Sequence, residues 1–125
     1  MKLIPEKVYK AWDSRQEAIV FSTIDKNGMP NSIYATCTSK FNDYTFIVAD
    51  NFFHKTRENI LVGSKGSILF ITKEGTSYQL KGALRYYTSG EIYDNMKEWN
   101  PERLPGKAVV ALEVEEVYSG SEKLV

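Results

Sequence analysis

The chain of 125 residues has one cysteine and one histidine, and its sixteen basic residues are balanced by sixteen acidic ones. A single cysteine excludes a disulfide framework, and with one histidine we expect no Cys/His zinc site and no other metal centre. A net charge of zero provides no long-range field for a polyanion, so we expect no nucleic-acid partner. The apolar runs are far shorter than the ~20 residues that span a bilayer, so we expect no membrane partner.

What the chain does contain is typical of a folded globular protein. Hydrophobic residues make up 42% and charged residues 26%, proportions that exclude disorder as the main state. The length fits a single domain, which we expect to span residues 1–125. The N-terminal residues show no targeting signal, and the free thiol of Cys37 fits a reducing compartment, so we expect a cytoplasmic protein.

The spacing of apolar residues predicts about three short helices and six strands. Most of the connections between strands are too short for a crossover, so neighbouring strands should be mostly antiparallel. A sheet this small protects its edges best by closing on itself, which predicts an α+β fold with a small barrel and helices at its ends. The helices are expected at 4–12, 54–61 and 92–99, and the strands at 18–24, 31–39, 44–49, 67–72, 78–87 and 108–115.

The junction between the third predicted strand and the second helix breaks a common charge rule. Lys55 and Arg57 lie in the first helical turn, where the helix dipole disfavours each cation by a few tenths to ~1 kcal/mol. A bound anion would compensate, because free backbone N–H groups, the Thr56 hydroxyl and the Lys55 ammonium together form a phosphate site. The alternative is a solvated basic turn in which Thr56 caps the helix, and the pattern leaves both interpretations open.

Two further segments allow either a binding or a structural interpretation. Segment 32–36 has small hydroxylated side chains on its polar face, with Tyr34 as the one large ring. It would suit a flat heterocycle, and it would equally suit an ordinary strand facing solvent. The adjacent Phe52 and Phe53 either pack against a ligand or partner, or form a hydrophobic staple at the helix entry. Cys37 falls on the apolar side of its predicted strand, which indicates a buried and inert thiol.

Six short segments carry a likeness to a known family: EAIVFST at 17–23, NGMPN at 27–31, FIVAD at 46–50, HKTRENI at 54–60, QLKG at 79–82 and GKAVV at 106–110. In this order and spacing the chain resembles the FMN-binding split-barrel family, which contains the pyridoxamine 5′-phosphate oxidase-like proteins. The likeness is strongest to the small single-domain flavin-binding members, and it runs from about residue 17 to residue 117.

The resemblance implies a split barrel that forms a homodimer, with FMN bound at the subunit interface. It also implies eight residues that contact the flavin, at its phosphate, its ribityl chain or its ring. These are Lys55 and Thr56 at the phosphate, Asp50 and Asn51 beside the ribityl chain and phosphate, Ser32, Ile33 and Tyr34 along the isoalloxazine ring, and Gln79 reaching the flavin from the second subunit.

The function implied by the resemblance is that of an FMN-dependent oxidoreductase or an electron-transfer protein acting on an unidentified small substrate or redox partner. Two alternatives keep the fold: a deazaflavin or haem in the same groove, or a non-catalytic dimeric module with no ligand. Pyridoxamine-phosphate oxidases proper carry a C-terminal segment with Arg and His that holds the substrate. This sequence stops at Val125 without such a segment, so we do not expect that oxidase activity.

Overall fold

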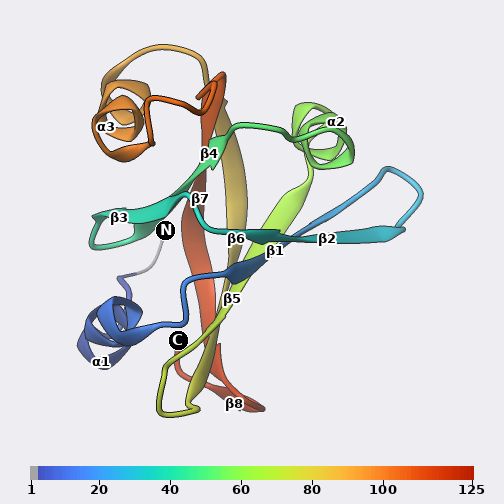
Figure 1. The fold of residues 1–125 in the computed structure, drawn as a ribbon. Coiled ribbons are helices and arrows are strands. Elements are labelled where there is room, and N and C mark those ends of the chain that lie inside the picture. Colours follow the sequence, from blue (N-terminus) through green and yellow to red (C-terminus); the bar gives the residue numbers. More distant parts are fainter. Residues whose placement is uncertain (1–2) are drawn as a thin grey trace.

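The computed structural model describes residues 3–125, which form an α+β split barrel of eight strands and three α-helices (Figure 1). The helices are α1 (Glu6–Ala11), α2 (Lys55–Leu61) and α3 (Glu91–Trp99), and a short 3-10 turn (Trp12–Ser14) follows α1. The strands are β1 (Ile19–Ile24), β2 (Pro30–Ala35), β3 (Thr38–Asn42), β4 (Thr45–Asp50), β5 (Lys65–Ile71), β6 (Ser77–Tyr87), β7 (Ala108–Ser119) and β8 (Glu122–Lys123).

The strands form one curled antiparallel sheet in the order β2-β1-β5-β6-β7-β4-β3, and β8 pairs with β7. The two edge strands, β2 and β3, follow each other in the chain and are joined by residues 36–37, so the chain itself links the two edges of the curl. In Figure 1, α2 and α3 lie at the top of the view and α1 at the lower left. None of the helices in residues 3–125 is long and apolar enough to cross a membrane.

The predicted count of six strands was too low. The strand expected at 31–39 is two strands, because the chain turns at residues 36–37, where the Ala49 N–H donates to the Cys37 carbonyl at 2.9 Å. Cys37 therefore lies in a link between strands and is half-buried, not in the middle of a strand. The other addition, β8, has two residues, too few for any periodic pattern to reveal.

Two apolar cores lie on opposite faces of the two neighbouring strands β4 and β7. Phe46 and Val48 of β4 point into the barrel core, whereas Ile47 and Ala49 point to a second core that also contains Met96 of α3. All four are buried. Because β4 is covered on both faces, its sequence is a continuous apolar run and not an alternating one. This double burial holds rigidly the end of β4, which leads into α2.

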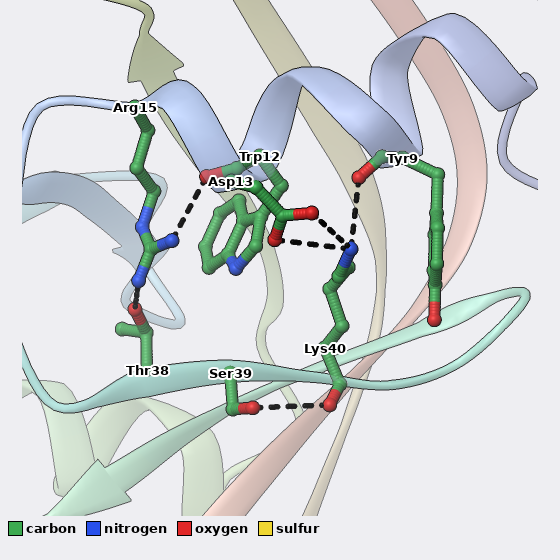
Figure 2. Close-up of polar contacts among 7 residues, drawn as sticks. All are labelled: Tyr9, Trp12, Asp13, Arg15, Thr38, Ser39 and Lys40. Atoms are coloured by element: carbon green, nitrogen blue, oxygen red, sulfur yellow. Dashed lines mark hydrogen bonds and ion pairs between the residues drawn. The ribbon is translucent and has the colours of Figure 1, made fainter.

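The N-terminal segment closes one side of the barrel and is held by two cations (Figure 2). Trp12 is 2% exposed, and its ring meets the rings of Phe46 and Phe70 edge-on at 4.4 and 5.1 Å. Arg15 lies 4.0 Å from the Trp12 ring and donates to the Trp12 carbonyl at 2.9 Å. Lys40 of β3 donates to the Tyr9 carbonyl at 3.1 Å and pairs with Asp13. These contacts fasten the N-terminal segment to β3.

Candidate functional site

A hollow of about 410 Å³ lies against β2 beside the end of β4. Its volume falls within the ~300–1,000 Å³ usual for small-molecule sites, and most of its wall is apolar. Three of the predicted ligand contacts, Ile33, Tyr34 and Asn51, line it. The rest of the wall consists of residues from the end of β2, the β2–β3 link, the end of β4 and two loops: Ala35, Thr36, Cys37, Ala49, Phe52, Phe53 and Leu104.

Two exposed aromatic rings stand at this hollow. Tyr34 is 79% exposed and Phe52 is 73% exposed, although large rings normally seek burial. Tyr34 is exposed because it lies on the outward-facing side of β2, where exposed and half-buried residues alternate. Phe53, the next residue, instead turns inward and contacts the ring of Phe21 with centroids 6.0 Å apart. The arrangement suits a flat apolar ligand, which would cover the ring surface of Tyr34 and Phe52 that is otherwise exposed to water.

Asp50, at the end of β4, is fully buried and held by a network of donors. Arg57 donates to both of its carboxylate oxygens, from Nε at 2.7 Å and from Nη2 at 3.0 Å. The Tyr86 hydroxyl donates to Oδ2 at 2.5 Å and the Phe53 N–H to Oδ1 at 3.0 Å. Burial by itself would raise the pKa of the Asp50 carboxyl, but these hydrogen bonds outweigh it and hold that pKa below the usual range.

The pKa values of the two side chains that bond to Asp50 are shifted in the opposite direction, upward. The hydrogen bond with Asp50 raises the pKa of the Arg57 guanidinium, so this side chain is a permanent cation. Burial, and then the hydrogen bond to Asp50, raises the pKa of the Tyr86 hydroxyl, which therefore stays protonated as a donor. Asp50 was predicted to lie beside the ribityl chain and phosphate. In this structure its oxygens are committed to the protein and its side chain is closed to solvent.

Asn51 lines the hollow, and both polar atoms of its side-chain amide are hydrogen-bonded within the chain. Its Oδ1 accepts from the Asn100 side chain and from the Gly106 N–H, both at 2.9 Å, and its Nδ2 donates to Asn100 Oδ1 at 3.1 Å. Gly106 has φ +49°, and a Cβ at this position would approach Asn100 Nδ2 to 3.0 Å. The loop between α3 and β7 is thereby fixed against β4, which brings Leu104 to the wall of the hollow.

The first turn of α2 presents one predicted residue to solvent and buries the other. The Lys55 side chain is 51% exposed, and its ammonium lies 3.9 Å from a carboxylate oxygen of Glu58, at the limit for an ion pair. Thr56 is 2% exposed, and its hydroxyl accepts from the Asn31 side chain at 3.1 Å. His54, not Thr56, occupies the N-cap position, and no side chain in residues 3–125 caps this helix. Capping by Thr56 is therefore not the role the structure shows.

The remaining predicted residues lie on the outer face of the sheet. Ser32 of β2 shares a 2.8 Å hydrogen bond with the hydroxyl of Ser22 on β1. Gln79 of β6 lines a separate shallow hollow of about 390 Å³ on this face. The eight residues thus fall into three groups within one chain. Ile33, Tyr34 and Asn51 line the hollow, Asp50, Thr56 and Lys55 lie behind it or on α2, and Ser32 and Gln79 lie on the outer face of the sheet.

Sequence reasoning overlooked Leu104 and the partners of Asp50. The opposite charges of Asp50 and Arg57, on either side of a strand-to-helix junction, were a usable signal for that ion pair. No sequence signal pointed to Tyr86 or Leu104. Both reach the site through tertiary structure, Tyr86 from β6 and Leu104 from the loop fixed by Asn51. No cluster of His, Cys, Asp or Glu in the described chain could hold a metal ion.

Comparison with known proteins places this geometry in a family context. The sequence pattern of the pyridoxamine 5′-phosphate oxidase family matches residues 5–120. An uncharacterized protein of Methanocaldococcus jannaschii is 29% identical over 122 residues, which cover 93% of this chain and 80% of that protein. The crystal structure of HupZ from Group A Streptococcus has a TM-score of 0.80 at 28% identity, over 94% of both chains. An FMN-binding protein from Syntrophomonas wolfei shares the fold, with a TM-score of 0.75 at 20% identity, over 93% of this chain and 96% of that chain.

Proposed function

The chain belongs to the pyridoxamine 5′-phosphate oxidase family, and from that premise we propose that it is an FMN-binding protein with an oxidoreductase or electron-transfer role. The observation that carries the proposal is the apolar hollow at β2 with two exposed aromatic rings, one of which, Phe52, lies in the short loop that leads into α2 and Lys55. Bound FMN would supply the hydride or electron chemistry. The substrate would be a small molecule or a redox partner, and the free thiol of Cys37 fits the cytoplasm as the compartment.

The residues present fit the two ends of FMN in different ways. The apolar wall and the rings of Tyr34 and Phe52 suit the isoalloxazine ring, because a flat heterocycle gains free energy from covering them. The exposed Lys55 ammonium suits the phosphate, because its Glu58 contact at 3.9 Å is weak and easily exchanged. Asp50 and Asn51 would support this site from behind, since their polar atoms are already bonded within the chain.

The proposal includes a homodimer, in which Gln79 comes from the second subunit. On the outer face the register aligns Tyr34, Val20, Leu69 and Gln79 across four neighbouring strands. Three strand spacings separate Tyr34 from Gln79 by about 14 Å along the sheet, too far for a glutamine side chain to reach a flavin at β2. The same face exposes Leu69 by 40% and Ile71 by 43%, apolar surface that a second copy would cover.

The first experiment is the absorption spectrum of the natively purified protein, followed by thermal unfolding with added ligand. We expect a flavin spectrum, FMN released on heating, and a stabilisation of about 2.7 kcal/mol when free FMN is 100 times its Kd. Deazaflavin and haem are compared in competition with FMN. Preferential binding of either would replace FMN as the ligand, and a colourless protein stabilised by none of the three would refute a cofactor role.

The phosphate contact is tested with the variant Lys55→Ala. Loss of one charge-assisted hydrogen bond should weaken FMN binding about 10- to 100-fold. Riboflavin, which lacks the phosphate, should lose little affinity. Lys10→Ala is the matched control, because Lys10 is also an exposed helical lysine with a glutamate one turn away, Glu6 at 2.8 Å. Equal losses for FMN and riboflavin would contradict a phosphate contact by Lys55.

The shared site is tested by mixing two variants. Lys55→Ala and Gln79→Ala homodimers should each bind FMN weakly. A mixed dimer has one site with both residues intact, but only if Lys55 and Gln79 of a site come from different subunits. Unfolding and refolding the two variants together should therefore restore tight binding at one site per mixed dimer. A monomer in sedimentation analysis, or a mixture that binds no better than the parents, would reject the shared site.

A further inference from the structure

Asp50, Arg57 and Tyr86 form a charged network that no proposed flavin contact uses. It joins three elements: Asp50 ends β4, Arg57 lies in the first turn of α2, and Tyr86 belongs to β6. Asp50 is 0% exposed, and the Arg57 side chain is 27% exposed. Burying a carboxylate is costly unless it is paired and fully hydrogen-bonded, so the position demands an explanation.

A direct role in holding a phosphate does not explain Asp50. Its negative charge would repel a phosphate bound at the neighbouring turn, and neither carboxylate oxygen is open to a ligand. Arg57 has the right charge, but two of its nitrogens are committed to Asp50 in fork geometry. What the network does accomplish is geometric, because it ties the start of α2 to the end of β4 and to β6.

Helix α2 depends on such ties more than most helices. It has seven residues, and helices this short are not stable by themselves. No side chain in the described chain caps its N-terminus. Its orientation therefore comes from its tertiary contacts: Thr56 with Asn31 at 3.1 Å, Asn59 with Thr23 at 3.0 Å, and Arg57 with Asp50. The contact of Arg57 with Asp50 is the ion pair among these three, and Arg57 lies two residues after Lys55.

We propose that Asp50, Arg57 and Tyr86 are positioning residues, which hold the first turn of α2 so that Lys55 meets the phosphate of a phosphorylated ligand. This inference rests on the proposed function and deepens it. Asp50 acts through Arg57 and does not touch the ligand. The network thereby selects phosphorylated over unphosphorylated flavins, because only the former reach the turn that it orients.

The sign of one substitution separates this role from simple electrostatics. Asp50→Asn removes a negative charge near the phosphate and releases Arg57, so a purely electrostatic account, or one in which Arg57 binds phosphate, predicts tighter FMN binding. Positioning predicts the opposite: FMN binding about tenfold weaker, with riboflavin binding changed less than about twofold. The matched control is Glu113→Gln, which removes the same charge from another Arg–carboxylate pair, Arg85 with Glu113 at 3.3 Å. It should leave both affinities unchanged.

Because Asp50→Asn could fail to fold, we add a milder variant, Tyr86→Phe, and a measurement that needs no flavin, hydrogen exchange. Tyr86→Phe keeps the charges of Asp50 and Arg57 and most of the side-chain volume, and it should also weaken FMN binding, by about threefold. Hydrogen exchange without ligand should show faster exchange of the Glu58 and Val62 amides, which bond to the His54 and Glu58 carbonyls, in both variants. The amides between β6 and β7 should stay protected, and the control variant should resemble the wild type.

The outcomes separate this inference from the proposed function. If the wild type binds FMN while folded Asp50→Asn binds it equally or more tightly, positioning is overturned and flavin binding stands. If both variants loosen α2 but the wild type binds no phosphorylated flavin, the proposed function fails and the network is structural only, which also overturns the inference. If α2 exchanges at the wild-type rate in both variants, the network does not orient the helix and the inference is wrong.

Discussion

Replacing Arg57 by glutamine should destabilise the protein far more than removing a surface cation would. In the wild type the buried Asp50 carboxylate accepts two hydrogen bonds from Arg57, one from Tyr86 and one from the Phe53 amide. Breaking a buried ion pair costs about 3–5 kcal/mol, because one charge is left without its partner. The lower end, about 3 kcal/mol, applies here because the Arg57 side chain is 27% exposed and two donors remain.

The loss should depend on pH in a definite direction. The folded chain holds the pKa of Asp50 below its usual range, so the stabilisation by the pair is complete above the unfolded pKa of about 3.9. It is lost as the pH falls through the lower, folded pKa. In Arg57→Gln, burial is less opposed, so the pKa of Asp50 rises and protonation relieves the buried charge at higher pH. The stability gap between the two proteins should therefore be widest near neutral pH and narrow steadily in acid.

The assay is urea unfolding from neutral pH to about pH 3, followed by circular dichroism and fluorescence. At neutral pH the expected loss of about 3 kcal/mol corresponds to a Tm lower by about 10–15 °C for a chain of this size. The control is Arg85→Gln, whose side chain is 59% exposed beside Glu113, and which should change stability by less than about 1 kcal/mol. Equal effects of the two substitutions, or a gap that widens in acid, would refute the reasoning.

Three further substitutions test the fold around the site. Trp12→Ala should cost about 3–5 kcal/mol in urea unfolding, because it removes a ring that is 2% exposed from the barrel core; a loss below 1 kcal/mol would mean that the N-terminal segment does not close the barrel. Gly82→Ala should cost about 3 kcal/mol or more, because a Cβ there would lie 1.9 Å from the Glu113 carbonyl oxygen at the β6–β7 bulge; wild-type stability would show that the two strands can separate freely. Asn51→Ala should cost about 2–3 kcal/mol and accelerate proteolysis of the α3–β7 loop, because it leaves the buried Gly106 N–H unpaired; an unchanged cleavage rate would disprove the clamp.

Part of the site could be read from the pattern of residues. Lys55 stood out because a cation in a first helical turn is unusual, and the structure shows it half exposed on α2, with its ammonium 3.9 Å from a Glu58 carboxylate oxygen. Tyr34 stood out as the one large ring on a small polar strand, and it does stand at the hollow. Their flavin contacts stay a prediction, as does the contribution of Gln79 from a second subunit.

The hydrogen-bond partners of Asp50, Asn51 and Thr56 were not readable in this way, and their predicted flavin contacts stay a prediction. Each carries a polar group suited to a ligand. Each is buried, however, and its polar group is hydrogen-bonded to a residue distant in sequence: Tyr86, Asn100 or Asn31. A side chain's type sets what it can donate or accept. Which partner it finds depends on which strands and loops come to lie beside it.

The sequence by itself determined the local elements of this protein. Alternation along strands, a 3.6-residue period along helices and short turns are properties of near neighbours, and they specify a mostly antiparallel sheet with three helices. Tertiary structure alone decided that one predicted strand bends into β2 and β3, that the Asp50 carboxylate is buried against Tyr86, and that Leu104 completes a hollow. The reason is that burial and hydrogen bonding depend on which residues meet in space. These partners are tens of positions apart in the sequence and come together only when the sheet closes.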